Sequence, residues 1–148
     1  MSINVDSMGN FRRITLDNGV VRAVFLPELG GKMISLVRRA SRGEFLLPPV
    51  REYRRATYGA AFEEFDTSGF DECLPTVAEC QFLVRPTREQ RLRDHGEVWS
   101  SPWEYEIAGE ELFLFRAWHL FALHLSQEIT LAGQRPCHRL RNTEPRRQ

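Results

Sequence analysis

The segment that decides the fold is Phe11-Arg-Arg-Ile-Thr-Leu-Asp17, followed after Asn18-Gly19 by Val20-Val-Arg-Ala-Val-Phe-Leu26. Both runs are rich in β-branched and aromatic residues, which favour β-strands. An Asn-Gly pair between two such runs is the strongest short hairpin signal, because a type I′ turn needs positive φ at both central residues. The sequence therefore predicts a β-hairpin with a type I′ turn over residues 11–26.

The rest of the chain continues as short strands separated by turns that contain glycine. We predict strands over residues 32–39, 44–47, 81–85, 103–107, 112–118 and 127–131, a charged connector over 87–93 and a frayed end beyond Gly133. A helix within residues 120–131 is an alternative, but the alternation of residues 127–131 favours strands. Residues 50–76 lack periodicity, which is typical of a functional loop. We expect an all-β fold, an antiparallel β-sandwich.

Composition indicates the class of protein and its compartment. The 148 residues have the length of a single domain, residues 1–148, and their formal net charge is zero, so no overall field attracts nucleic acid or an anionic membrane. The positive charge is nearly all arginine, and the arginines look scattered rather than gathered on one face. Three cysteines without a signal peptide indicate free thiols in a reducing compartment. We expect a soluble, cytoplasmic protein with no nucleic acid or membrane partner.

The segment Asp94-His-Gly-Glu-Val-Trp-Ser-Ser-Pro-Trp103 gathers the residue types that grip a sugar. Its acids and His95 could bond hydroxyl groups, and an indole could stack on the C–H face of the ring. A surface turn with one Trp anchored in the core would have the same composition. We expect Trp99, which precedes Ser-Ser-Pro, to be exposed, and Trp103 to be in the core.

The histidines give no support to a metal site. His95, His119, His124 and His138 form no His-x-His or helical i,i+4 pair, and no Cys-x-x-Cys occurs. We therefore predict no metal and no other cofactor.

Several segments together resemble the aldose 1-epimerases and their galactose mutarotase-like relatives. Asp94-His-Gly96 with the downstream Trp103 resembles the His-Gly segment and Trp of the glucose-6-phosphate 1-epimerase branch. The resemblance rests on the order and spacing of the segments over residues 14–143, because none is specific alone; the others are Leu16–Val20 with Phe25–Leu36, Ser68–Thr76, and Gln127–Leu131 with Leu140–Thr143.

The resemblance implies a large β-sandwich whose enzymes interconvert the α and β anomers of an aldose with a general acid and a general base. It makes His95 a contact to a sugar hydroxyl; the alternative is a turn histidine satisfied by Asp94 or the backbone. Asp71 and Glu72 on the loop could accept sugar hydroxyls, or be solvated acids. Lys32, after Gly30-Gly31, could contact substrate or be a strand-end charge. The substrate-binding set is thus His95, Asp71, Glu72, Asp94, Trp99 and Lys32.

The sequence departs from the family pattern in two places. In the family the catalytic Glu and His follow the Asn-Thr segment, whereas here the sequence ends five residues after Thr143. We therefore expect an N-terminal portion of such a sandwich, with catalytic residues unknown. In the sugar-phosphate branch an Arg suited to phosphate follows the His-Gly pair, and Trp99 stands at the comparable position, which favours an unphosphorylated sugar.

Three functions remain open at this point. The first is an aldose 1-epimerase-like protein that interconverts or binds anomers of a free hexose. The second is a non-catalytic carbohydrate-binding sandwich. The third is an inactive truncated remnant whose exposed strand edges could pair two copies into a homodimer.

Overall fold

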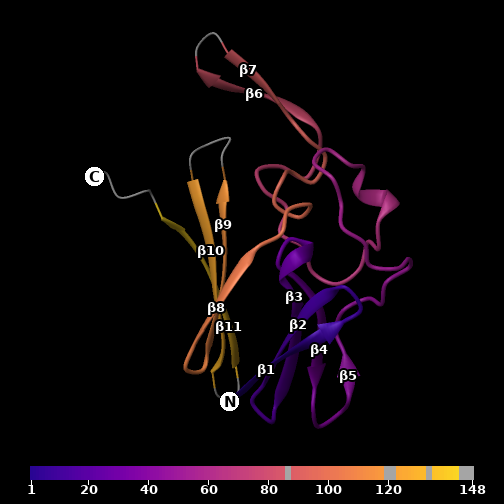
Figure 1. The fold of residues 1–148 in the computed structure, drawn as a ribbon, viewed down its shortest axis with the longest axis vertical. Helices are drawn as coiled ribbons and strands as arrows, with labels where there is room; N and C mark the ends of the chain where they lie inside the picture. The colour runs from indigo at the N-terminus through magenta and orange to yellow at the C-terminus, as the bar shows by residue number, and fades with distance from the viewer. Residues whose placement is uncertain (86–87, 119–122, 133–134, 144–148) are drawn as a thin grey trace.

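The structure is a computed structural model, and it describes residues 1–85, 88–118, 123–132 and 135–143. The described chain forms two antiparallel sheets and a separate two-stranded hairpin, so the expected all-β class is confirmed (Figure 1). Its helical turns are the short 3₁₀ segments η1 (Pro27–Leu29) and η2 (Phe62–Glu64). No helix among the described residues has the length and apolar character needed to cross a membrane.

The first sheet is a meander in which each strand pairs with the next one along the chain. Its strands are β1 (Ser2–Met8), β2 (Phe11–Asp17), β3 (Val21–Leu26), β4 (Lys32–Arg38) and β5 (Gly43–Glu44). The predicted hairpin is confirmed as β2 and β3, but the turn type is wrong: Gly19 has a φ of 81°, and Asn18 does not share a positive φ. Instead, Asn18 Oδ1 accepts hydrogen bonds from the N–H groups of Val20 and Val21, so its side chain organises the turn.

The second sheet has the order β11-β10-β9-β8. Its strands are β8 (Glu104–Ala108), β9 (Glu111–Trp118), β10 (Leu123–Ala132) and β11 (Arg135–Thr143). We expected fraying beyond Gly133, and over residues 135–143 that expectation is wrong because β11 pairs with β10 along its whole length. The rest of that expected frayed end, residues 144–148, lies outside the described residues. Of residues 120–131, where a helix was an alternative, residues 120–122 lie outside the described residues.

A hairpin of β6 (Cys80–Arg85) and β7 (Arg88–Leu92) projects away from both sheets (Figure 1). The expected charged connector over 87–93 is therefore wrong, since most of it is β7. A strand outside the sandwich has no face against the core, so its sequence need not alternate apolar and polar residues. β1 was also missed: it is the edge strand of the first sheet, and most of its residues are exposed.

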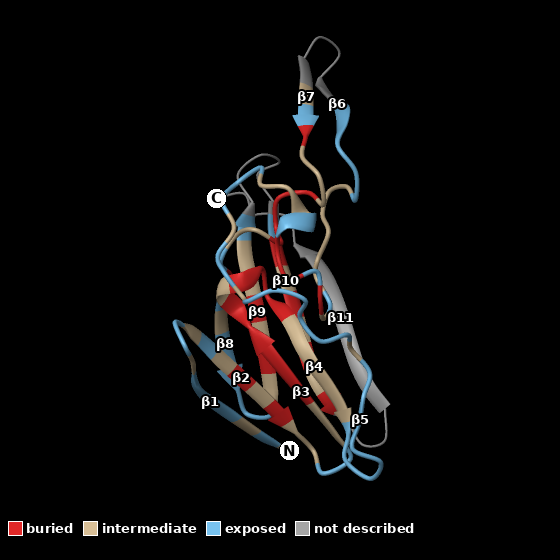
Figure 2. Ribbon diagram, turned by 90° about the vertical axis from the view of Figure 1, so that its right-hand side faces the viewer, coloured by how far each residue is buried: buried red, intermediate tan, exposed pale blue. Residues whose placement is uncertain are grey.

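The core lies between the two sheets and draws alternate residues from each (Figure 2). Ile14 and Leu16 of β2 face inward from the first sheet, and Leu112 and Leu114 of β9 from the second. Burying a side chain of this size stabilises the fold by roughly 1.5–3 kcal/mol. The rest of the cluster is Ala23, Phe25, Val98, Trp103, Leu125, Ile129 and Leu131. The predicted sandwich and the predicted core position of Trp103 are both confirmed.

The predicted loop is also confirmed: between β5 and β6 the chain forms no strand, and this segment includes η2. The predicted strand over residues 44–47 is therefore wrong beyond Glu44, where β5 ends. One contact anchors it to the first sheet. The N–H of Met33 in β4 donates to the carbonyl of Phe70 (3.0 Å), and Phe70 returns a bond to Met33 (2.9 Å). This pairing places the residues after Phe70 beside the start of β4.

Candidate functional site

The two segments on which the sequence analysis concentrated lie against each other. Leu74, just after Asp71 and Glu72, forms a parallel bridge with Gly96, and the N–H of Glu97 donates to the carbonyl of Leu74 (2.9 Å). Gly96 has a φ of 72°, and a Cβ there would lie 2.0 Å from the Leu74 oxygen, so the approach requires glycine. The acidic pair of the loop is thereby held next to the Asp94-His95 pair.

Lys32 is the buried centre of this region, with 3% of its surface exposed. Its ammonium contacts Asp66 Oδ2 at 2.6 Å and Asp71 Oδ2 at 2.7 Å, and it donates to the Ser68 carbonyl at 2.8 Å. All three N–H donors of a lysine can be satisfied by three such oxygens. Lys32 is therefore more than a strand-end charge: its contacts hold the loop against the start of β4.

Asp71 uses only one of its two carboxylate oxygens in this cluster. Oδ2 meets Lys32, whereas Oδ1 is buried and has no hydrogen-bond partner in the described part of the chain. Burial raises the pKa of Asp71, and Lys32 offsets only part of that effect; Asp66 adds to the rise and His95 opposes it. A buried carboxylate oxygen without a partner is unfavourable, and a ligand hydroxyl at this point would relieve it.

His95 is held flat against an aromatic ring. Its imidazole stacks on Phe62 with a centroid distance of 3.9 Å and an angle of 8° between the rings. Nδ1 lies 3.0 Å from Asp94 Oδ2, close enough for an ion pair when the imidazole is protonated, but the direction is not that of a hydrogen bond, and Nδ1 remains without one among the described residues. His95 has a φ of 53°, a left-handed conformation that is uncommon for a residue with a Cβ.

Glu72 connects the loop to the second sheet, because its Oε1 accepts a hydrogen bond from Gln127 Nε2 of β10. Burial raises the pKa of Glu72; the bond from Gln127 opposes the rise, and Asp71 adds to it. Gln127 is 1% exposed and was missed as a site residue. The sequence did hold a signal, since Gln127 is the polar member of the inward-facing series Leu125, Gln127, Ile129 and Leu131.

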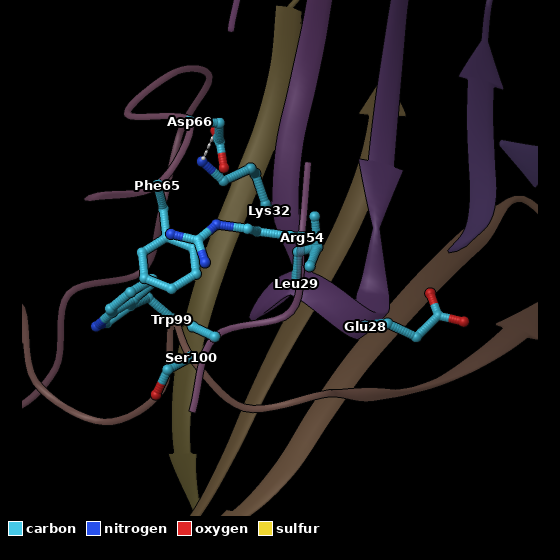
Figure 3. Close-up of a pocket in the computed structure, with 9 residues that line it drawn as sticks. Glu28, Leu29, Lys32, Arg54, Phe65, Asp66, Trp99 and Ser100 are labelled. Atoms are coloured by element: carbon cyan, nitrogen blue, oxygen red, sulfur yellow. Dashed lines mark hydrogen bonds and ion pairs between the residues drawn. The ribbon is translucent and has the colours of Figure 1, made fainter. Parts of the chain in front are cut away.

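Trp99 is buried, with 6% exposure, so the expectation that it would be exposed is wrong. The edges of Phe62 and Phe65 pack against it, and a Cβ on Gly30 would lie 2.3 Å from its carbonyl oxygen. With Lys32 and Asp66 it lines a cavity of about 10 Å³, which holds roughly one water molecule (Figure 3). Figure 3 shows Lys32 directed toward Asp66, and Glu28 directed away. No sugar fits in this space.

The structure thus brings together five of the six predicted residues, Lys32, Asp71, Glu72, Asp94 and His95, and places Trp99 behind them. The supporting residues Phe62, Asp66 and Ser68 were missed. Asp66 Oδ2 accepts from both the hydroxyl (2.7 Å) and the N–H (3.3 Å) of Ser68. Spacing along the sequence carries no signal for these contacts, because they depend on how the loop folds back.

Comparison with known proteins gives a likeness in fold. No protein-family model matches the sequence. No curated protein matches it either. Among solved structures, YeaD from Salmonella typhimurium, a proposed mutarotase, superposes with a TM-score of 0.54 at 16% identity over 86% of this chain. A 4-alpha-glucanotransferase from Thermococcus litoralis superposes with a TM-score of 0.53 at 15% identity over 88% of this chain.

The chain has a galactose mutarotase-like fold. The fold predicted from the resemblance is therefore confirmed, while identities of 15–16% carry the likeness no further than the fold. The chain spans 42% of the length of YeaD and 22% of the length of the glucanotransferase.

Proposed function

We propose that this chain is an aldose 1-epimerase-like protein that binds a free hexose at the cluster of Asp71, Glu72, Asp94 and His95. The observation that carries the proposal is the presence of two buried polar atoms, Asp71 Oδ1 and His95 Nδ1, without hydrogen-bond partners in the described structure. A sugar hydroxyl both donates and accepts, so neighbouring hydroxyls match a carboxylate oxygen and an imidazole nitrogen.

The surroundings of the two atoms favour binding of a polyol that approaches from solvent. The side chains of His95 and Asp94 are 30% and 37% exposed, whereas that of Asp71 is 7% exposed. A sugar ring approaching from solvent would meet the half-exposed His95 and Asp94 before the buried Asp71. The exposed Phe70 beside Asp71 offers an apolar face for the C–H side of a sugar. The names of the two structural neighbours, a proposed mutarotase and a glucanotransferase, point to the same ligand class.

Anomer exchange makes a further demand, because the acid and the base must stand on opposite sides of the reacting carbon. The titratable groups of this cluster come from two adjacent segments, residues 71–72 and 94–95, which the Leu74–Gly96 bridge holds together. That arrangement favours a second candidate function, carbohydrate binding without catalysis.

Titration with α-glucose and α-galactose, followed by calorimetry and ligand-observed NMR, tests the binding. We expect saturable binding that His95→Asn weakens about tenfold, since asparagine tolerates a positive φ but cannot replace the ring. The matched control is His124→Asn, because His124 is an exposed residue of β10. Failure of either sugar to bind, or equal weakening by the two variants, would refute the proposal.

Saturation transfer between the anomeric signals in the same samples separates the two candidates. Exchange faster than in the buffer alone supports epimerase activity. Binding with exchange at the buffer rate supports the non-catalytic function.

A further inference from the structure

Three arginines that looked scattered in the sequence converge on the first sheet. A groove of about 530 Å³ is lined by Arg22 of β3, Val37 of β4, and Arg39 and Arg42, which both follow the end of β4. The groove lies near the end of β4 opposite to Lys32. A strand of this length extends about 20 Å, so the groove is separate from the Asp71–His95 cluster.

The guanidinium groups of this groove make few direct contacts with acids. Arg22 Nε is buried and has no hydrogen-bond partner among the described residues. The side chain of Arg42 forms no hydrogen bond or ion pair with any described residue. Arg39 has one carboxylate neighbour, Asp17, whose Oδ2 lies 3.4 Å from its Nε.

The other nearby acid, Glu44 of β5, is occupied by its own strand and the one beside it. Its carboxylate accepts from the Ser35 hydroxyl (2.6 Å) and from the N–H groups of Leu36 (2.8 Å) and Leu46 (3.0 Å). These bonds hold the pKa of Glu44 below its usual range despite partial burial. Asp17 and the ionised Glu44 flank the three guanidinium groups and leave one net positive charge, and the bonds that Glu44 already makes leave guanidinium N–H donors available for an anion.

Guanidinium groups suit phosphate, because their planar N–H forks bond two of its oxygens at once. Arg42 lies in the turn between β4 and β5 and has a φ of 52°, a left-handed backbone conformation that is unusual for arginine. Val37 gives the groove an apolar wall. The volume of the groove leaves room for an organic group attached to the phosphate.

We propose that the groove of Arg22, Arg39 and Arg42 binds a phosphate group, as inorganic phosphate or as a phosphate ester. The proposal is independent of the hexose cluster, which faces a different part of the molecule. It extends the function to a second, anionic ligand.

Titration of the full chain with inorganic phosphate at low ionic strength, followed by NMR chemical shifts and calorimetry, tests the proposal. We expect saturable binding that Arg42→Asn weakens about tenfold or more, because asparagine keeps the positive φ but lacks the charge. Arg55→Asn is the matched control, since Arg55 is exposed and lies on the long loop. Circular dichroism of both variants verifies the fold.

A parallel titration with glucose 6-phosphate, in the presence of saturating glucose, distinguishes the two sources of phosphate. Tighter binding than inorganic phosphate assigns the groove to an ester, and equal binding assigns it to the phosphate group alone. Asp71→Asn should leave phosphate binding unchanged, so failure of the hexose proposal would not affect this result. No saturable binding of phosphate, or equal weakening by Arg42→Asn and Arg55→Asn, would overturn the proposal.

Discussion

The two ends of strand β4 hold positive charge in opposite ways. At its start, Lys32 is 3% exposed and contacts two carboxylates and a carbonyl. Just past its end, Arg39 has one carboxylate neighbour at 3.4 Å, and Arg42 has none in the described structure. A buried cation must be matched by the chain's own acids, because desolvation is expensive, whereas hydrated guanidiniums can exchange water for a ligand. The first end organises the structure, and the second is available for binding.

Replacement of Lys32 gives the largest expected effect. Lys32→Met leaves Asp66 and Asp71 buried without their cation, and we expect a loss of about 3–5 kcal/mol in unfolding free energy. Arg39→Met at the other end breaks a half-exposed ion pair and should cost less than about 1 kcal/mol. Urea denaturation of both variants measures the difference. Equal losses would mean that the two ends do not differ as described.

Substitution of two glycines tests the contact between the loop and the Asp94-His95 segment. Gly96→Ala would place a Cβ 2.0 Å from the Leu74 oxygen, whereas Gly109 has a similar φ of 64° and nothing within 4 Å of the new atom. Both variants incur the cost of left-handed backbone, about 1–2 kcal/mol. Gly96→Ala should lose about 1–3 kcal/mol more because of overpacking. Thermal unfolding measures both; a similar loss in the two variants would contradict the close approach.

The raised pKa of Asp71 makes a prediction about pH. A carboxyl group whose pKa is raised on folding binds its proton more tightly in the folded state, so its contribution to stability falls as the pH rises above the unfolded value of 3.8. Asp71→Asn removes this titration. We therefore expect the stability of the wild type, relative to Asp71→Asn, to fall between about pH 4 and the raised pKa. Denaturant titrations of both proteins across this range measure it, and a rise in relative stability would reverse the assignment.

The smallest expected effect is at Arg42. Arg42→Gly removes a charged residue from left-handed backbone, and it should raise the unfolding free energy by roughly 0.5–1 kcal/mol. The same variant should lose phosphate binding, so stability and binding change in opposite directions. Differential scanning calorimetry measures the gain. A loss of stability would show that Arg42 has a structural role similar to that of Lys32.

The sequence predicted those parts of the fold in which one face of a strand is buried. Ile14 and Leu16 of β2, and the series at the end of β10, show their period in the sequence because alternate residues meet the core. β1 and β7 show no such period and were missed. The loop was predicted from the lack of any period, although its internal contacts were not.

The sequence predicted the polar residues of the candidate site but not the residues that hold them in place. Asp71, Glu72, Asp94 and His95 came from two short segments whose composition and resemblance pointed to a sugar. Phe62 beneath His95 and Gln127 beside Glu72 come from distant parts of the chain, and only folding brings them near. The burial of Trp99 was missed for the same reason, since its aromatic neighbours Phe62 and Phe65 lie on the long loop.

The meander order of both sheets has a consequence for how the chain folds. Every strand pair in β1–β5 and in β8–β11 joins neighbours along the sequence, so each sheet can form by successive closure of short loops. Burial of Leu16 of the first sheet and Leu114 of the second in one core requires the chain between the two sheets to close as well. We expect hairpin formation to be fast and the meeting of the two sheets to limit the folding rate, so that substitutions in the long loop between β5 and β6 change folding speed more than strand content.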